Sequence, residues 1–83
     1  MRNYIPKNLQ KLYNEELEPC PQNDKLFESL LYHVKQEKII NRELKKNNDL
    51  KTLITLGNSL NANTKSIIAL MNTFIYKELE EEF

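Results

Sequence analysis

The chain has 83 residues, carries 12 basic and 12 acidic side chains, and contains a single cysteine. This length fits one domain with a small core, and one cysteine excludes an intrachain disulfide. The lack of paired cysteines and of an apolar run typical of a signal peptide favours the cytoplasm. No stretch is apolar enough for a membrane span. Small domains without disulfides are usually stabilised by regular helix packing or oligomerisation.

The first expected helix spans about residues 6–18. Pro6 suits the first helical position because its missing N–H would be unpaired there anyway. The apolar residues of this segment follow at helical spacing: Leu9, Leu12, Tyr13 and Leu17. Pro19 and Pro21 predict a connector over residues 19–23, because proline disfavours helical geometry in the residue before it.

A second helix is expected over about residues 24–46, with Asn23 or Asp24 capping its first turn. Its apolar stripe begins strongly, thins over residues 35–38 and then resumes. The stripe consists of Leu26, Phe27, Leu30, Leu31, Val34, Ile39, Ile40 and Leu44.

The C-terminal half predicts a helix over about residues 49–60 and another over about residues 63–82. The segment GNSLNANTKS, residues 57–66, is typical of a turn, and Asn63 or Thr64 can cap the last helix. The alternative is one continuous helix, because four apolar residues follow one another at intervals of seven: Leu53, Leu60, Ile67 and Phe74. We favour the break. The whole pattern predicts an all-α bundle of three to four helices, with a long C-terminal helix or a helical hairpin.

Nothing in the sequence predicts catalysis. His33 has no nucleophile or carboxylate marked by spacing as its partner, and Cys20 has no cationic neighbour that would activate its thiol. One glycine excludes the usual phosphate-binding loops, and no metal-ligand spacing occurs. We therefore expect no enzyme, no catalytic residue, no metal, no cofactor and no small-molecule ligand.

The C-terminal apolar face is the first candidate binding site. Its residues form either the protein's own core or an interface with a partner helix: Leu53, Leu60, Ile67, Ile68, Met71, Phe74 and Ile75. Asn61 and Thr64, the polar positions within this stripe, are candidates for fixing the register of packing, as a buried asparagine does in coiled coils.

A basic stripe is the second candidate site. Five basic residues are spaced to share one helix face and could contact phosphates: Lys35, Lys38, Arg42, Lys45 and Lys46. Two other interpretations remain open. The stripe is a solvated face with Glu37 and Glu43 interspersed, or it binds a protein partner such as the acidic tail, Glu80 to Glu82, within an oligomer.

Two segments also resemble a known family. The charged helix QEKIINRELKK, residues 36–46, followed by NSLNANTKSIIALM, residues 58–71, is similar to the helical region of phage small terminase subunits. The resemblance implies an oligomeric, largely helical protein that guides a packaging motor to phage DNA, and no functional residue is transferred from it.

The first functional hypothesis is therefore a non-enzymatic interaction protein, encoded by a phage or mobile element, that binds itself or another protein. The second is a nucleic-acid-binding protein of small-terminase type that uses the basic stripe. The third is a small regulator or inhibitor of a host protein, acting by mimicry through the acidic segment Glu78 to Phe83.

Overall fold

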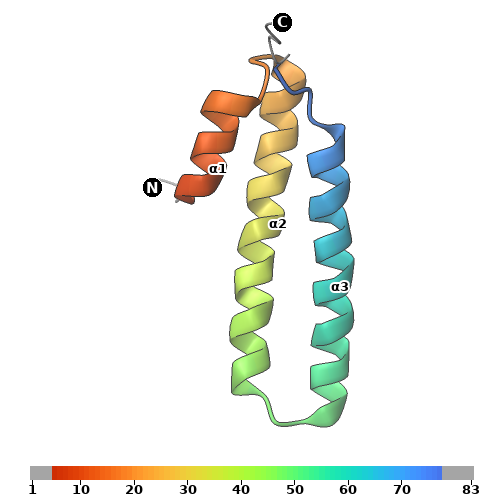
Figure 1. Ribbon diagram of the computed structural model, residues 1–83. Coiled ribbons are helices and arrows are strands. Elements are labelled where there is room, and N and C mark those ends of the chain that lie inside the picture. The colour runs from red at the N-terminus through yellow and green to blue at the C-terminus, as the bar shows by residue number, and fades with distance from the viewer. Residues whose placement is uncertain (1–4, 78–83) are drawn as a thin grey trace, which may run out of the picture.

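The computed structural model describes residues 5–77 and contains three helices. The first, α1 (Lys7–Lys11), continues into one π-helical turn, η1 (Leu12–Glu16); α2 (Pro21–Lys46) and α3 (Leu50–Thr73) follow. Helices α2 and α3 run antiparallel as a long hairpin, and α1 lies beside the first half of α2 (Figure 1). The predicted all-α fold with a helical hairpin is confirmed, and residues 5–77 form no strand.

Helix α2 begins earlier than the sequence predicted. Pro21 is its first residue, preceded by Cys20, so the connector is shorter than residues 19–23 and Asn23 lies inside the first turn. The prediction of Asn23 or Asp24 as the helix cap is wrong, because a proline at the first helical position needs no cap for its missing N–H. Asn23 uses its side chain elsewhere, as described below.

Helix α3 is continuous, so the predicted break within residues 57–66 is wrong. The helix runs from Leu50 to Thr73, without a positive φ angle at Gly57 or any other described residue. The Asp49 carboxylate caps it by accepting a hydrogen bond from the Thr52 N–H at 3.0 Å. Continuity is favoured because the apolar heptad spacing runs straight through the polar segment. Of the predicted helix over 63–82, residues 74–77 are extended and residues 78–82 lie outside the described part.

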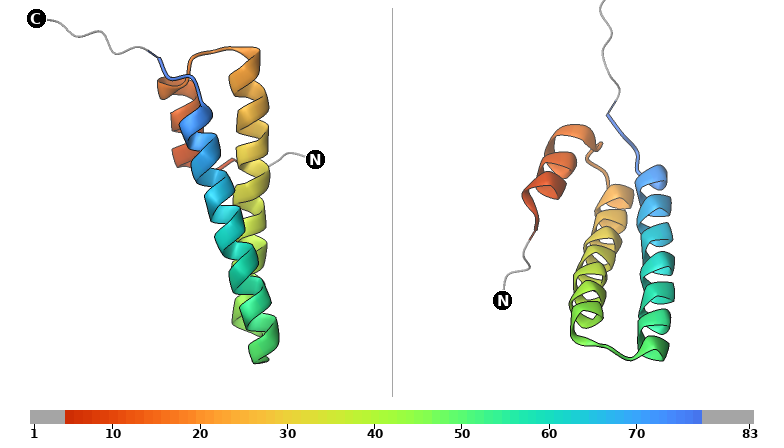
Figure 2. Two further views of the ribbon diagram at one scale, coloured as in Figure 1. Left: turned by 90° about the vertical axis from the view of Figure 1, so that its right-hand side faces the viewer. Right: turned by 60° about the horizontal axis from the view of Figure 1, so that its bottom comes forward.

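The two long helices meet along complementary seams that follow a three-then-four spacing. The α3 seam holds Leu53, Leu56, Leu60, Asn63, Ile67, Leu70 and Phe74, none of them exposed. The α2 seam holds Asn23, Leu26, Leu30, His33, Glu37, Ile40, Leu44 and Asn47, also none exposed. This spacing is that of antiparallel coiled-coil packing. The two helices pack against each other, and Figure 2 shows that they cross at a shallow angle.

Burial is concentrated at one end of the hairpin. The core consists of Leu12, Leu17, Phe27, Leu30 and Phe74, and no residue between Leu31 and Ala62 is buried. We call residues 5–34 and 63–77 the latched end, and residues 35–62 the loop end. The loop end is a bare helical pair, because α1 and η1 cover only the first half of α2 (Figure 1).

A hydrogen-bonded latch joins the chain after α3 to the connector before α2. The Glu18 N–H donates to the Ile75 carbonyl at 2.9 Å, and the Lys77 N–H donates to the Glu16 carbonyl at 2.8 Å. The Asn23 side chain, only 1% exposed, completes the latch. Its amide donates to the Glu18 and Ile75 carbonyls, each at 2.7 Å, and its oxygen accepts from the Ile75 N–H at 2.9 Å. All three bonding groups of this buried side chain are therefore used.

Candidate interaction surfaces

Helix α3 presents a second face beside its seam. Residues at helical spacing form this outer stripe: Leu50, Ile54, Gly57, Asn61, Lys65, Ile68 and Asn72. At 3.6 residues per turn the centre of the outer stripe lies about 130° around the helix from the centre of the seam. No described element covers this side of α3, as Figure 1 and both views of Figure 2 show.

The outer stripe carries three exposed apolar side chains and a single charge. Leu50 is 71% exposed, Ile54 57% and Ile68 55%. Between Thr52 and Tyr76 the only charged residue is Lys65, whereas α2 carries ten charged residues over Pro21–Lys46. Exposed single apolar residues are ordinary on protein surfaces. An aligned set on a nearly uncharged helix is the composition typical of an interface centre.

The structure divides the predicted interface residues into three groups. Phe74, 5% exposed, lies in the chain's own core, and Ile67 and Met71 pack against that core. Leu53 and Leu60 are half-buried in the seam. Only Ile68 and Ile75 are exposed, at 55% and 42%. The apolar pattern of residues 53–75 thus contributes to two faces of the protein, and the spacing alone did not separate them.

The five basic residues of the predicted stripe are all exposed on the second half of α2: Lys35, Lys38, Arg42, Lys45 and Lys46. Glu37 falls in the seam instead, and by helical spacing Glu43 lies to one side of the basic stripe. Glu43 still reaches Lys46 at 3.9 Å, an exposed pair that contributes little stability. Of the two acidic residues of the solvated-face interpretation, Glu37 therefore lies in the seam and Glu43 at the edge of the basic stripe. Residues Glu80 to Glu82, the suggested partner tail, lie outside the described residues.

A polar pair of the buried Asn63 and the half-buried His33 crosses the hairpin where the latched end meets the loop end. The Asn63 amide donates to the His33 carbonyl at 2.7 Å, and the Asn63 oxygen lies 2.7 Å from Nδ1 of His33. The sequence interpretation named Asn61 and Thr64 as register residues, but both are exposed while Asn63 is buried. The heptad spacing of the sequence does indicate Asn63 as the seam position, because it lies seven residues from both Leu56 and Leu70.

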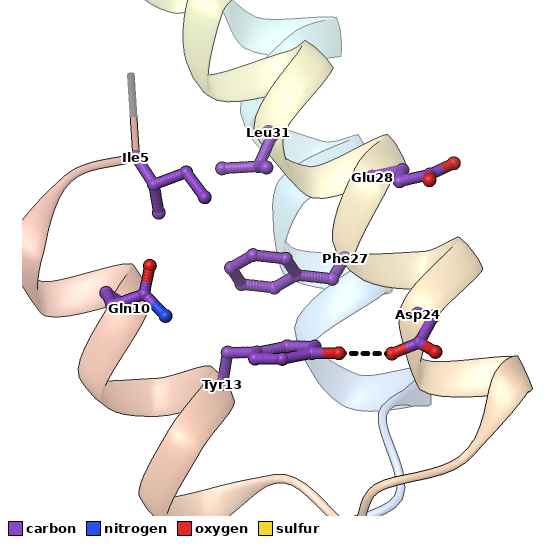
Figure 3. A pocket seen from close by; sticks show the side chains of 7 residues that line it. All are labelled: Ile5, Gln10, Tyr13, Asp24, Phe27, Glu28 and Leu31. Carbon is purple, nitrogen blue, oxygen red and sulfur yellow. Dashed lines mark hydrogen bonds between the residues drawn. The ribbon is translucent and has the colours of Figure 1, made fainter. Parts of the chain in front are cut away.

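A shallow cleft of about 330 Å³ lies between α1 and α2. In Figure 3 the Phe27 ring forms its floor between Leu31 and Tyr13, and the Tyr13 hydroxyl donates to the Asp24 carboxylate. That hydrogen bond, with smaller contributions from burial and from the negative charge of Asp24, raises the pKa of Tyr13 above its ordinary value. Because the polar groups of this pair satisfy each other, they leave little for a ligand to recognise.

The remaining chemistry-bearing residues of the described part do not converge on a site. Cys20 is half-buried in the connector with no second cysteine. No group of three or more histidine, cysteine, aspartate or glutamate side chains within residues 5–77 is arranged to hold a metal ion. Within the same residues, no helix combines the length and apolar character needed to cross a bilayer.

Comparison with known proteins adds no assignment. The sequence matches no protein-family model, and no curated protein or solved structure shows significant similarity to it. The surfaces described above are therefore the basis for any inference about function.

Proposed function

We propose that this protein is a non-enzymatic interaction protein that self-associates through helix α3. The observation that carries the proposal is the outer stripe, where Leu50, Ile54 and Ile68 are exposed on a helix that is nearly free of charge. Burying such a face removes apolar surface from water, at about 25 cal/mol for each Å². No lost ion pair opposes that gain, because the stripe contains one charge.

The weak core of the hairpin supports a second copy as the partner. The loop end has no buried residue, and a chain of this size gains little stability from its own core. Two hairpins that associate side by side form a four-helix arrangement, a common way to cover exposed helix faces. Helix α3 has 24 residues, so it offers a contact about 36 Å long.

Introducing a charge on the outer stripe tests this proposal. Phe74 is unsuitable because its burial in the chain's own core means that Phe74→Glu would unfold the latched end. Ile54→Glu replaces an exposed residue, so the fold survives and the oligomer dissociates. Thr55→Glu is the matched control, since it adds the same charge at the neighbouring, exposed position outside the stripe.

The measurement is absolute mass by light scattering after size exclusion, at low and high salt. We expect a discrete oligomer for the unmodified chain and for Thr55→Glu, and a monomer for Ile54→Glu with an unchanged helical circular dichroism spectrum. A monomeric unmodified chain at high micromolar concentration would refute the proposal.

A second candidate function, nucleic-acid binding, is favoured by the basic stripe. Its five cations are exposed on one face of α2, and Glu37 is turned away from them into the seam. This placement suits phosphate contacts, and it agrees with the resemblance to small terminase subunits. The outer stripe and the basic stripe lie on different helices, so both functions are compatible in one assembly.

Binding of a fluorescent DNA duplex, measured as a function of salt, tests the second candidate. Affinity should fall steeply as salt rises, because contacts to phosphates release counterions. Paired charge reversal at Lys38 and Arg42 should abolish binding. Lys25→Glu, an exposed position of α2 outside the stripe, should weaken it only slightly. Equal losses in the two variants would count against a specific site.

A further inference from the structure

We infer that the partner of the outer stripe is a second copy bound antiparallel, with the two-fold axis passing beside Asn61. This inference rests on the proposed self-association and adds its geometry. In a two-fold interface the same patch faces itself, and when the two helices are antiparallel each residue meets the residue at the mirrored position along the other helix. The surface must therefore be self-complementary about one point.

The positions of the outer stripe are symmetric about Asn61, and this symmetry places Leu50 opposite Asn72. Ile54 and Ile68 lie seven residues before and after it, so each isoleucine of one copy opposes the other isoleucine of its partner. The contact between Ile54 and Ile68 therefore occurs twice in the dimer. These two are among the most exposed large apolar residues within residues 5–77. Because the axis lies near the middle of α3, the whole helix is within reach of its counterpart.

Charge selects the antiparallel orientation over the parallel one. Lys65 is the only charged residue of the outer stripe, and it lies four residues after Asn61. Parallel packing would set Lys65 of one copy against Lys65 of the other, which repels. Antiparallel packing sets Lys65 opposite Gly57, four residues before Asn61, and separates the two ammonium groups.

Gly57 supplies room at that point. A glycine inside a helix costs about 1 kcal/mol relative to alanine. A Cβ atom built at Gly57 meets no atom within 4 Å, so packing inside the chain does not require the glycine. Close approach of another helix gives it a role, because the aliphatic stem of the opposing lysine can lie over the bare backbone while its charge reaches water.

Asn61 fits the position on the axis. Its side chain is exposed in the single chain and makes no hydrogen bond within residues 5–77. Two asparagines that meet on a two-fold axis can each donate to and accept from the other. A polar pair at the centre of an apolar seam disfavours shifted registers, as it does in coiled coils.

Disulfide trapping tests this geometry in the full chain, with Cys20→Ser as background to remove the native thiol. Facing residues on the axis of two packed helices approach the Cα separation of a disulfide, about 4.4–6.8 Å. Asn61→Cys should therefore convert most chains to a covalent dimer under mild oxidation. Ala62→Cys, exposed on the adjacent position and turned away from the outer stripe, should remain largely uncrosslinked.

The outcomes separate the two claims. An oligomer that is trapped by Asn61→Cys and not by Ala62→Cys supports the antiparallel two-fold. An oligomer that is trapped equally by both variants, or by neither, overturns this geometry but leaves self-association standing. A chain that is monomeric before oxidation overturns the geometry and the proposed function together.

Discussion

The two ends of the hairpin are built on different principles. At the latched end, Leu17, Leu30 and Phe74 are buried, and the Asn23 side chain joins the two chain segments that meet there. At the loop end, each of these two helices continues for about three and a half turns without one buried residue. The heptad spacing is the same along both halves, so spacing sets which residues face each other and a third covering segment sets how well they are buried.

The difference between the two ends indicates which part of the molecule provides stability and which part is available for binding. The latched end gains its burial from α1, η1 and the segment after α3. The loop end and the outer stripe of α3 have no such cover among residues 5–77. Regions with few buried contacts open locally at low free-energy cost. We therefore expect the latched end to hold the fold, and the outer stripe to be completed by association.

The largest expected effect comes from paired truncations on α2. Leu30→Ala removes a side chain that is 1% exposed and leaves a cavity, so it should lower the free energy of unfolding by about 3–4 kcal/mol. Leu44→Ala, at the equivalent seam position of the loop end, should cost about 1 kcal/mol because Leu44 is only half-buried. Urea unfolding followed by circular dichroism measures both.

The same pair of variants also reports on assembly. The measurement is made first at a concentration low enough for the chain to be monomeric. If Leu44→Ala becomes as costly as Leu30→Ala at high concentration, the loop end is buried by another copy. Equal costs at low concentration would contradict the contrast between the two ends.

The next effect concerns the latch. Asn23→Ala leaves the Glu18 carbonyl and the Ile75 N–H without the partner they have in Asn23, whereas the Ile75 carbonyl keeps its bond from the Glu18 N–H. Buried groups left unpaired are costly, so stability should fall by about 2–3 kcal/mol. Asn41→Ala is the control on the same helix. Asn41 is exposed, so the better helix propensity of alanine should leave stability equal or slightly raised. A small loss for Asn23→Ala would show that the latch contributes little.

Local sequence patterns predicted much of this fold. Apolar spacing predicted the helices and the hairpin, and the spacing of Lys35 to Lys46 placed the basic side chains on one face. The prolines gave the connector, although Pro21 proved to begin α2 and not to precede it. These features depend on residues within a few turns of one another, which is the range that periodicity can report.

The prediction for Asn23 is wrong and the role of Phe74 was left open because both concern contacts with residues that are distant in the sequence or in another copy. Asn23 meets Ile75 across 52 positions, and no local rule connects them. The polar composition of segment 57–66 predicts a turn, but its heptad phase puts Asn63 in the seam, and α3 is continuous through the segment. Spacing also could not say whether Phe74 packs inside the chain or against another copy, because both partners accept the same apolar face.

A smaller effect is expected at the boundary between the two ends. Asn63→Leu replaces the polar seam residue by the residue found at Leu56 and Leu70. The half-buried His33 can still reach water, so stability should stay within about 1 kcal/mol of the unmodified chain. The pairing with His33 should lose its specificity, which amide NMR would show as extra or broadened signals. A single sharp set of signals would contradict a register role for Asn63.

The smallest expected effect lies at the loop end, where Asp49 caps α3. The Oδ2 atom of Asp49 accepts from Thr52 Oγ1 at 2.8 Å and from the Thr52 N–H at 3.0 Å, and these two bonds lower the pKa of Asp49. A lowered folded-state pKa means that the stabilisation is complete above the unfolded value, about 3.9, and is lost as pH falls through the folded value. Asp49→Asn keeps the capping geometry but does not titrate. The thermal midpoint of this variant at pH 7 should lie within a few degrees of that of the unmodified chain. As the pH is lowered, its midpoint should fall less than that of the unmodified chain. An unchanged acid profile would show that the loop end frays at this cap, and that the contrast between the two ends extends to the hairpin turn itself.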